Sequence, residues 1–143
     1  MKYSALLLGA VLSLAYAGVL RAEVAPPVAV DIDVKPGSAV NSINVKSHGT
    51  TPVALLCSST FDPVTVDTST VVMGTDASTS GATAQHCALE DINGDGCLDL
   101  VCHFATQDLG VVCGVTELSI AGLLTDGTPL TGTDTIVTVP CKP

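Results

Sequence analysis

Residues 91–100 read DINGDGCLDL and place oxygen-bearing side chains at alternate positions of one short loop. Counted from the first Asp, the first, third, fifth and ninth positions carry Asp or Asn, and the sixth is a glycine that permits a sharp bend. Carboxylate and carbonyl oxygens are the ligands that hard cations such as Ca²⁺ prefer. The stretch therefore predicts a calcium loop whose ligands are Asp91, Asn93, Asp95, Asp99 and the main-chain carbonyl of Cys97.

The segments on either side of this loop predict that it lies at the tip of a β-hairpin. Residues 84–90 and 98–104 are short, are rich in residues that strands accept, and lack apolar residues at helical spacing. A helix-flanked EF-hand would also need a bidentate Glu at the twelfth position, where this chain has Cys102. The alternative is that Asn-Gly-Asp-Gly is only a good turn sequence, but a turn does not need Asp at the first and ninth positions.

The loop and its immediate flanks resemble the calcium hairpins of FG-GAP and VCBS repeats, whose pattern is D-x-D/N-x-D-G-x-x-D-L. The resemblance implies calcium binding at the loop. It does not imply the propeller that such repeats build, because a propeller needs several copies and this chain has one.

The rest of the chain predicts an all-β fold, a single disulfide-linked β-sandwich of about eight short strands. Alternating apolar and acidic residues mark 28–34 as a half-buried strand, and the apolar run 52–57 predicts a strand buried on both faces. An Asp-Gly pair at 126–127 predicts a hairpin turn, and residues 134–139 are expected to form the terminal strand. Residues 75–83 are small and polar and are expected to form a mobile loop.

Strand alternation within the hairpin predicts which of its side chains face the core. The apolar set is expected to face inward: Leu98, Leu100, Cys102 and Phe104. On the other face, Asp99 would reach the ion, and His103 would meet solvent or the edge of the opposite sheet.

The N-terminal residues predict export. Residues 1–22 combine an early lysine with an apolar run and small residues, which fits a secretory signal peptide cut after Ala17 or Ala22. An uncleaved membrane anchor is the alternative, but the apolar run is short for a bilayer span. The mature domain would then be residues 23–143, secreted to the extracellular space or the periplasm and without membrane contact.

All six cysteines follow this segment, and an even number in an exported chain predicts as many as three disulfides. No two of them are spaced as C-x-x-C, so a zinc ribbon or a thioredoxin-type site is not expected. The chain has no tryptophan and only two Tyr and two Phe. Cross-links and bound ions are therefore expected to supply part of the stability that aromatic packing gives other proteins.

The chain is acidic, with 14 Asp and Glu against 5 Lys and Arg and a formal net charge of −9. Such a surface repels nucleic-acid phosphates and anionic lipids, and it attracts divalent cations. Nucleic acid is therefore excluded as a partner. The expected partners are a divalent cation and a protein or glycan of the extracellular matrix or cell surface.

A wider resemblance covers most of the predicted mature chain, from Val28 to Lys142. The blocks VDIDVKPGS, NSIN, LEDINGDG, CGVTE and DTIVTV look like an uncharacterised domain of secreted bacterial proteins. The resemblance implies an extracellular all-β module with one calcium loop, and it implies no activity. Cysteines similar to Cys113 and Cys141 recur in those relatives, so a disulfide between them is expected. The other four allow three pairings, which the sequence leaves open: Cys57, Cys87, Cys97 and Cys102.

The sequence carries no motif for a catalytic nucleophile or a zinc protease, such as G-x-S-x-G or H-E-x-x-H. If Cys87 lies opposite Cys102 in the hairpin, then His86 lies opposite His103 on the other face. These two imidazoles, with Glu90 further along, could hold a transition metal, and the simpler alternative is a pair of surface histidines. The sequence therefore favours a non-catalytic calcium-binding β-sandwich module, structural, adhesive or ligand-binding, over a small extracellular metal-dependent hydrolase using His86, His103 and Glu90.

Overall fold

The computed structural model describes residues 25–142, so the predicted signal peptide lies outside the described residues. Within this range the chain is all-β, as the sequence predicts, apart from two short 3₁₀ helices, η1 (Pro63–Thr65) and η2 (Thr106–Leu109). No helix among these residues is long and apolar enough to cross a membrane.

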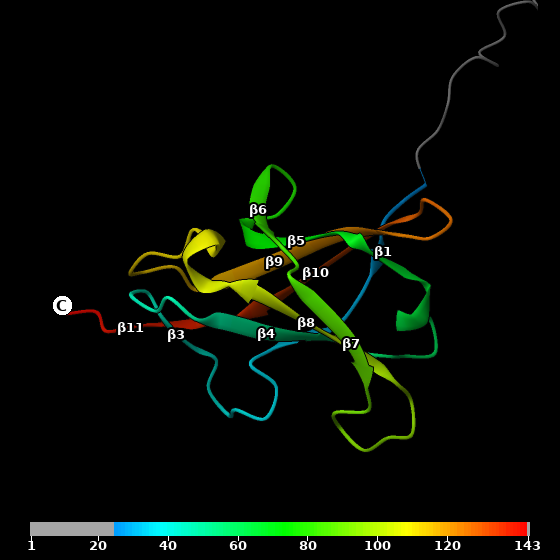
Figure 1. The fold of residues 1–143 in the computed structure, drawn as a ribbon, viewed down its shortest axis with the longest axis horizontal. Helices are drawn as coiled ribbons and strands as arrows, with labels where there is room; N and C mark the ends of the chain where they lie inside the picture. Colours follow the sequence, from blue (N-terminus) through cyan, green and yellow to red (C-terminus); the bar gives the residue numbers. More distant parts are fainter. Residues whose placement is uncertain (1–24, 143) are drawn as a thin grey trace, which may run out of the picture.

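The described residues form eleven strands in three sheets (Figure 1). The five-stranded sheet has the order β1 (Val28–Ala29), β10 (Pro129–Thr135), β9 (Glu117–Leu124), β5 (Val66–Asp76) and β6 (Ser80–Thr83). The four-stranded sheet has the order β2 (Ile32–Val34), β4 (Thr50–Leu55), β8 (Asp99–Ala105) and β7 (His86–Glu90). The third sheet is a parallel pair, β3 (Ser42–Asn44) and β11 (Val137–Val139).

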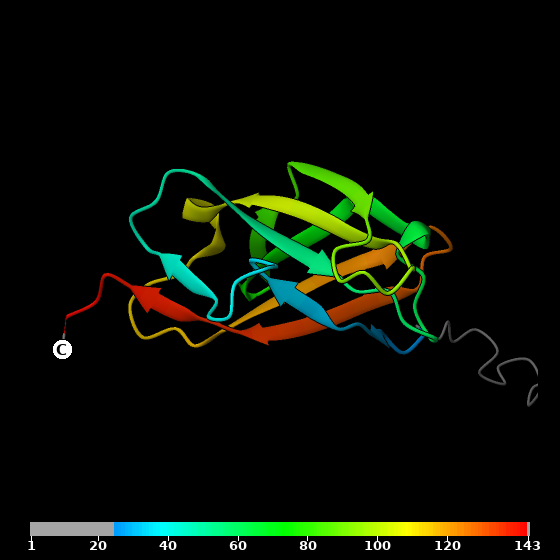
Figure 2. The ribbon, with the colours of Figure 1, turned by 90° about the horizontal axis from the view of Figure 1, so that it is seen from below.

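The two larger sheets lie face to face, and their inner sides enclose one aliphatic core (Figure 2). Each sheet contributes alternate residues of its strands, which is the period that strand geometry imposes on a buried face. The four-stranded sheet buries Val53, Leu55, Leu100 and Phe104. The five-stranded sheet buries Val71, Met73, Leu118, Ile120 and Leu130.

The strand count and the number of sheets differ from the predicted single sandwich of about eight strands, because two predicted strands each divide between two sheets. The expected strand 28–34 breaks after Ala29, so that β1 pairs with β10 in one sheet and β2 pairs with β4 in the other. The expected terminal strand 134–139 breaks at Ile136 in the same way, between β10 and β11. Hydrophobic alternation does not reveal such a change of partner.

Residues 75–83 do not form the loop that their composition predicts. The chain continues as β5 to Asp76, turns, and returns as β6, which pairs with β5 in an antiparallel hairpin. A Cβ at Gly81 would lie 2.6 Å from the carbonyl oxygen of Met73, so a glycine is needed where these strands approach. Small residues allow these two strands to pack closely. The same composition is also typical of loops, so composition alone predicts a loop here.

The predicted inner face of the β7–β8 hairpin is confirmed for Leu100, Cys102 and Phe104, which are all buried. Leu98 is an exception, because 48% of its surface is exposed. The strand β8 begins only at Asp99, so Leu98 still belongs to the loop and the alternation of the strand does not extend to it.

Three disulfides link all six cysteines. The expected pair Cys113–Cys141 is present. The pairings that the sequence left open are Cys57–Cys97 and Cys87–Cys102. The second of these joins residues that lie directly opposite each other in β7 and β8, which fixes the register of the hairpin.

We predict that Phe104→Ala lowers the free energy of unfolding by about 3 to 5 kcal/mol, because it empties a large buried volume between the sheets. The matched control is Leu98→Ala, an apolar truncation in the same hairpin at an exposed position, which should cost less than about 1 kcal/mol. Denaturant unfolding with the disulfides intact measures both. Similar costs for the two variants would contradict this assignment of the inner face.

Candidate metal centre

Residues 91–98 connect β7 to β8 and form the loop that the sequence singles out. Glu90 pairs with Asp99 at the base of the loop. Gly94 and Gly96 adopt positive φ angles of 73° and 86°, which a side chain would strain. The two glycines therefore make the tight path of the loop possible.

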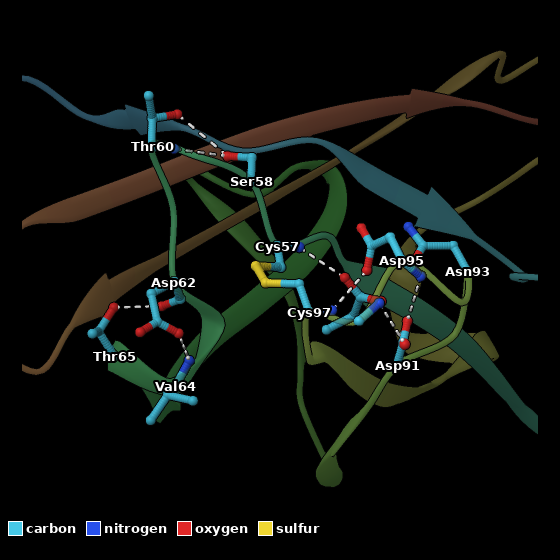
Figure 3. The surroundings of a disulfide bond; sticks show 12 residues. Cys57, Ser58, Thr60, Asp62, Val64, Thr65, Asp91, Asn93, Asp95 and Cys97 are labelled. Carbon is cyan, nitrogen blue, oxygen red and sulfur yellow. Dashed lines mark hydrogen bonds between the residues drawn. A yellow bond between two sulfur atoms is a disulfide. The ribbon is translucent and has the colours of Figure 1, made fainter.

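The loop wraps around the carboxylate of Asp91. One of its oxygens accepts the N–H groups of Gly94 at 2.9 Å and Asp95 at 3.2 Å, and the other accepts the N–H of Gly96 at 2.9 Å. Asn93 and Asp95 also accept main-chain N–H groups of the loop through their side-chain oxygens. These bonds hold the oxygens of three loop side chains close together (Figure 3).

Asp99 is fully buried at the start of β8. One of its carboxylate oxygens accepts the N–H of Cys57 at 2.8 Å, and the other accepts the N–H of Ile92 at 3.1 Å. A buried carboxylate is tolerated only when it is hydrogen-bonded or paired with a cation. Asp99 thus ties the loop to the chain just after β4, and the Cys57–Cys97 disulfide ties the same two segments covalently (Figure 3).

The three carboxylates converge. Asp91, Asp95 and Asp99 can each place one oxygen within 4.8 Å of the others, and within residues 25–142 this is the one group of three or more His, Cys, Asp or Glu side chains that could hold a metal ion. Oxygens on opposite sides of a bound Ca²⁺ are about 5 Å apart, since each lies about 2.3 to 2.6 Å from the ion. The three oxygens are therefore close enough together to hold one metal ion between them.

The structure brings together three of the five predicted ligands, Asp91, Asp95 and Asp99, as a group that could hold a metal ion. Asn93 and Cys97 lie in the same loop. The side chain of Asn93 accepts the main-chain N–H of Asp95, and the main-chain N–H of Cys97 donates to the carboxylate of Asp95. The sulfur of Cys97 is in a disulfide, so only its main-chain carbonyl could serve as a ligand.

The second predicted group, His86, His103 and Glu90, is only partly assembled. His86 and His103 lie opposite each other as expected, with ring centres 5.8 Å apart. Glu90 lies four residues further along β7, which corresponds to about 13 Å in an extended strand. It therefore does not join the two imidazoles, and it lies instead at the base of the carboxylate loop.

A groove of about 470 Å³ adjoins the loop on the outer face of the four-stranded sheet. Its lining combines carboxylates with apolar side chains: Asp33, Glu90, Asp91, Leu56, Ile92 and Val101. The sequence does not reveal that Asp33 lies near the loop, because β2 and β7 are the two outermost strands of this sheet and lie far apart in the chain. The alternation of residues 28–34 does place Asp33 on the outer face, so that part of the signal was present.

Burial and the nearby negative charge of Asp134 raise the pKa of the Asp33 carboxyl above its usual value. Asp134 is itself held in place, because it accepts hydrogen bonds from the main chain of Val34 and the side chain of Asn41, both at 2.9 Å. The repulsion between these two carboxylates is therefore built into the contact between β10 and the β2 segment.

No family model, no curated protein and no solved structure matches this chain. The chemistry and the geometry of its own side chains are therefore what indicate the role of the site. The resemblances to calcium hairpins and to a secreted bacterial domain stay expectations from the sequence.

We predict that Asp99→Ala destabilises the protein even without any metal ion, because it leaves the N–H groups of Cys57 and Ile92 without acceptors in a buried setting. Each such loss costs about 1 to 3 kcal/mol. The matched control is Asp95→Ala, which removes an exposed carboxylate from the same loop and should cost less than about 1 kcal/mol under these conditions. Denaturant unfolding in excess chelator measures both, and equal costs would refute the anchoring role of Asp99.

A second prediction concerns pH. The raised pKa of Asp33 means that the folded state binds its proton more tightly than the unfolded state does, so this group lowers stability at neutral pH. The penalty should disappear as the pH falls through the raised value. Asp33→Asn should therefore raise the melting temperature at pH 7 in chelator, and the gain should shrink towards pH 3. Asp31→Asn, an exposed change on the same segment, should show no such trend, and a gain of equal size at both pH values would contradict the mechanism.

Proposed function

We propose that the protein is a secreted calcium-binding β-sandwich module with a structural, adhesive or ligand-binding role and no catalytic activity. The observation that carries this proposal is the convergence of Asp91, Asp95 and Asp99 in one hairpin loop. All their donor atoms are carboxylate oxygens, which suit hard cations and not the softer transition metals. Asn93 and the carbonyl of Cys97 would complete the protein part of the shell, and water molecules would fill the remaining positions.

Electrostatics support a cation at this place. Four carboxylates occur within ten residues, those of Glu90, Asp91, Asp95 and Asp99, and the chain as a whole carries a formal charge of −9. Without a cation these groups repel one another, and the burial of Asp99 makes its own charge costly. A bound divalent ion would relieve both costs, so it would favour the folded state.

The surroundings of the loop favour a structural ion over a sensor. A sensor needs an element with two arrangements that the ion can select between. Here the loop is restrained by the Cys57–Cys97 disulfide and the hydrogen bonds of Asp99, and its hairpin is closed by Cys87–Cys102. An ion bound to so restrained a loop would stabilise it in place.

The three disulfides support the secreted location, because disulfides form and persist mainly outside the cytosol. The groove beside the loop supports a ligand-binding role, since ligand sites are commonly hollows with apolar walls and a few polar groups. The hydrolase alternative gains no support from the geometry, because Glu90 lies far along the strand from the two histidines.

Calcium should raise the melting temperature of the oxidised mature protein relative to the protein in excess chelator. Calcium at a hundred times its dissociation constant stabilises a single site by about 2.7 kcal/mol. The site should prefer Ca²⁺ to Mg²⁺, because Mg²⁺ demands a smaller and more regular shell. Thermal melting with each ion, followed by calorimetric titration, measures these effects.

The loop variant for this experiment is Asp95→Ala, which should abolish the response to calcium while the protein still folds. Glu117→Gln, which removes one exposed negative charge at the start of β9, is the control for the change in net charge and should respond like the natural protein. A melting temperature that does not move between chelator and millimolar calcium would overturn the proposal. An equal loss of the calcium response in both variants would mean that calcium binding depends on the overall charge of the protein and not on the loop.

A further inference from the structure

The two histidines of the hairpin form a second arrangement of possible metal ligands, separate from the carboxylate loop. His86 in β7 and His103 in β8 lie directly opposite each other, on the side of the four-stranded sheet that faces away from the core. Their ring centres are 5.8 Å apart, and the ring planes are inclined by 31°. The rings are therefore close but not stacked.

One of these rings has an unsatisfied nitrogen. The Nδ1 atom of His103 is buried and makes no hydrogen bond, and among the described residues it is the one buried side-chain nitrogen or oxygen in this condition. Buried polar atoms without a partner are rare in folded proteins, and each calls for a specific explanation. His86 is exposed on the edge strand, so the pair can be reached from solvent.

The spacing suits a shared metal ion. Imidazole nitrogens bind transition metals at about 2.0 to 2.1 Å, which brings the centres of two rings on one ion to about 5 to 6 Å from each other. The adjacent pair, Cys87 and Cys102, is covalently linked. This cross-link holds β7 and β8 in register, so little conformational freedom would be lost on binding.

The chemistry around the pair selects the kind of metal. The neighbouring positions on this face are occupied by Pro52, Ala88 and Val101, which offer no charge and no ligand atom. All six cysteines are in disulfides, so no thiolate competes. Imidazole ligands alone suit Zn²⁺, Cu²⁺ or Ni²⁺ and do not suit Ca²⁺, and Cu²⁺ generally binds most tightly in this series.

We propose that His86 and His103 together form a second metal site, which takes Cu²⁺ and related transition-metal ions through one nitrogen of each imidazole. The site is distinct from the carboxylate loop in position and in the metal that it selects. Solvent or a ligand from a partner would occupy the other coordination positions. The proposal does not depend on calcium binding.

Copper titration of the oxidised mature protein in excess calcium tests the proposal. Calorimetry gives affinity and stoichiometry, and electron paramagnetic resonance detects coupling of the copper to imidazole nitrogens. The expected result is one Cu²⁺ per chain with nitrogen coupling. Either His86→Ala or His103→Ala should weaken binding by about tenfold or more, since even the loss of a residue that only supports a ligand costs a metal site that much.

His48→Ala is the matched control, because His48 is the remaining histidine of the chain and lies exposed in another loop. It should bind copper like the natural protein. His86 is exposed on an edge strand, so its replacement should leave the fold intact even if the half-buried His103 proves to be needed for stability. Asp95→Ala should lose the calcium response and keep copper binding, which separates this proposal from the previous one.

Two results would overturn the proposal. Copper binding that survives both hairpin replacements would place the ion elsewhere. An equal loss of copper affinity in His48→Ala would mean that copper binds surface histidines in general and does not select the pair.

Discussion

The carboxylate of Asp99 is fully buried, and both of its oxygens accept main-chain N–H groups, one from Cys57 after β4 and one from Ile92 in the loop. The organisation of the candidate metal centre depends on this contact. It holds the loop against the four-stranded sheet while it places a negative charge where two further carboxylates, those of Asp91 and Asp95, can reach it. One side chain therefore attaches the loop and also contributes a negative charge to the group of carboxylates that could hold a metal ion. The Cys57–Cys97 disulfide reinforces the same attachment, so the loop keeps its place despite the repulsion among its charges.

The outer face of the four-stranded sheet carries the side chains of the described residues that are candidates for binding. It carries the groove with Asp33 and Glu90, the pair of imidazoles, and the base of the carboxylate loop. The inner face of the same sheet is aliphatic and contributes Val53, Leu55 and Phe104 to the core. This division follows from strand geometry, because successive side chains point to opposite sides. Small charged or polar substitutions on the outer face should therefore have little effect on the packing between the sheets.

Much of the hairpin could be predicted from the sequence, because its signals are local. The spacing of Asp91, Asp95 and Asp99 indicated a shared site, and the alternation of β8 indicated the burial of Leu100 and Phe104. The predictions that were wrong concern features that depend on contacts between distant parts of the chain. The chain changes sheets near Val30 and at Ile136 because of the strands that lie beside it, and β6 forms because Gly81 fits closely against Met73. The contribution of Asp33 to the groove depends likewise on a sheet order that brings distant segments together.

The disulfides also determine how the folded chain would carry tension. A covalent path from residue 25 to residue 142 can leave the main chain at Cys57, rejoin it at Cys97, leave again at Cys113 and rejoin at Cys141. The two bypassed segments contain six strands, β5, β6, β7, β9, β10 and β11, whereas β1 to β4 and β8 lie on the load-bearing path. A pull on the two ends could therefore separate the sheets without drawing out most of their strands. The cross-links limit how far the chain can be extended. A module stretched between two attachment points would therefore refold from a state that is still compact.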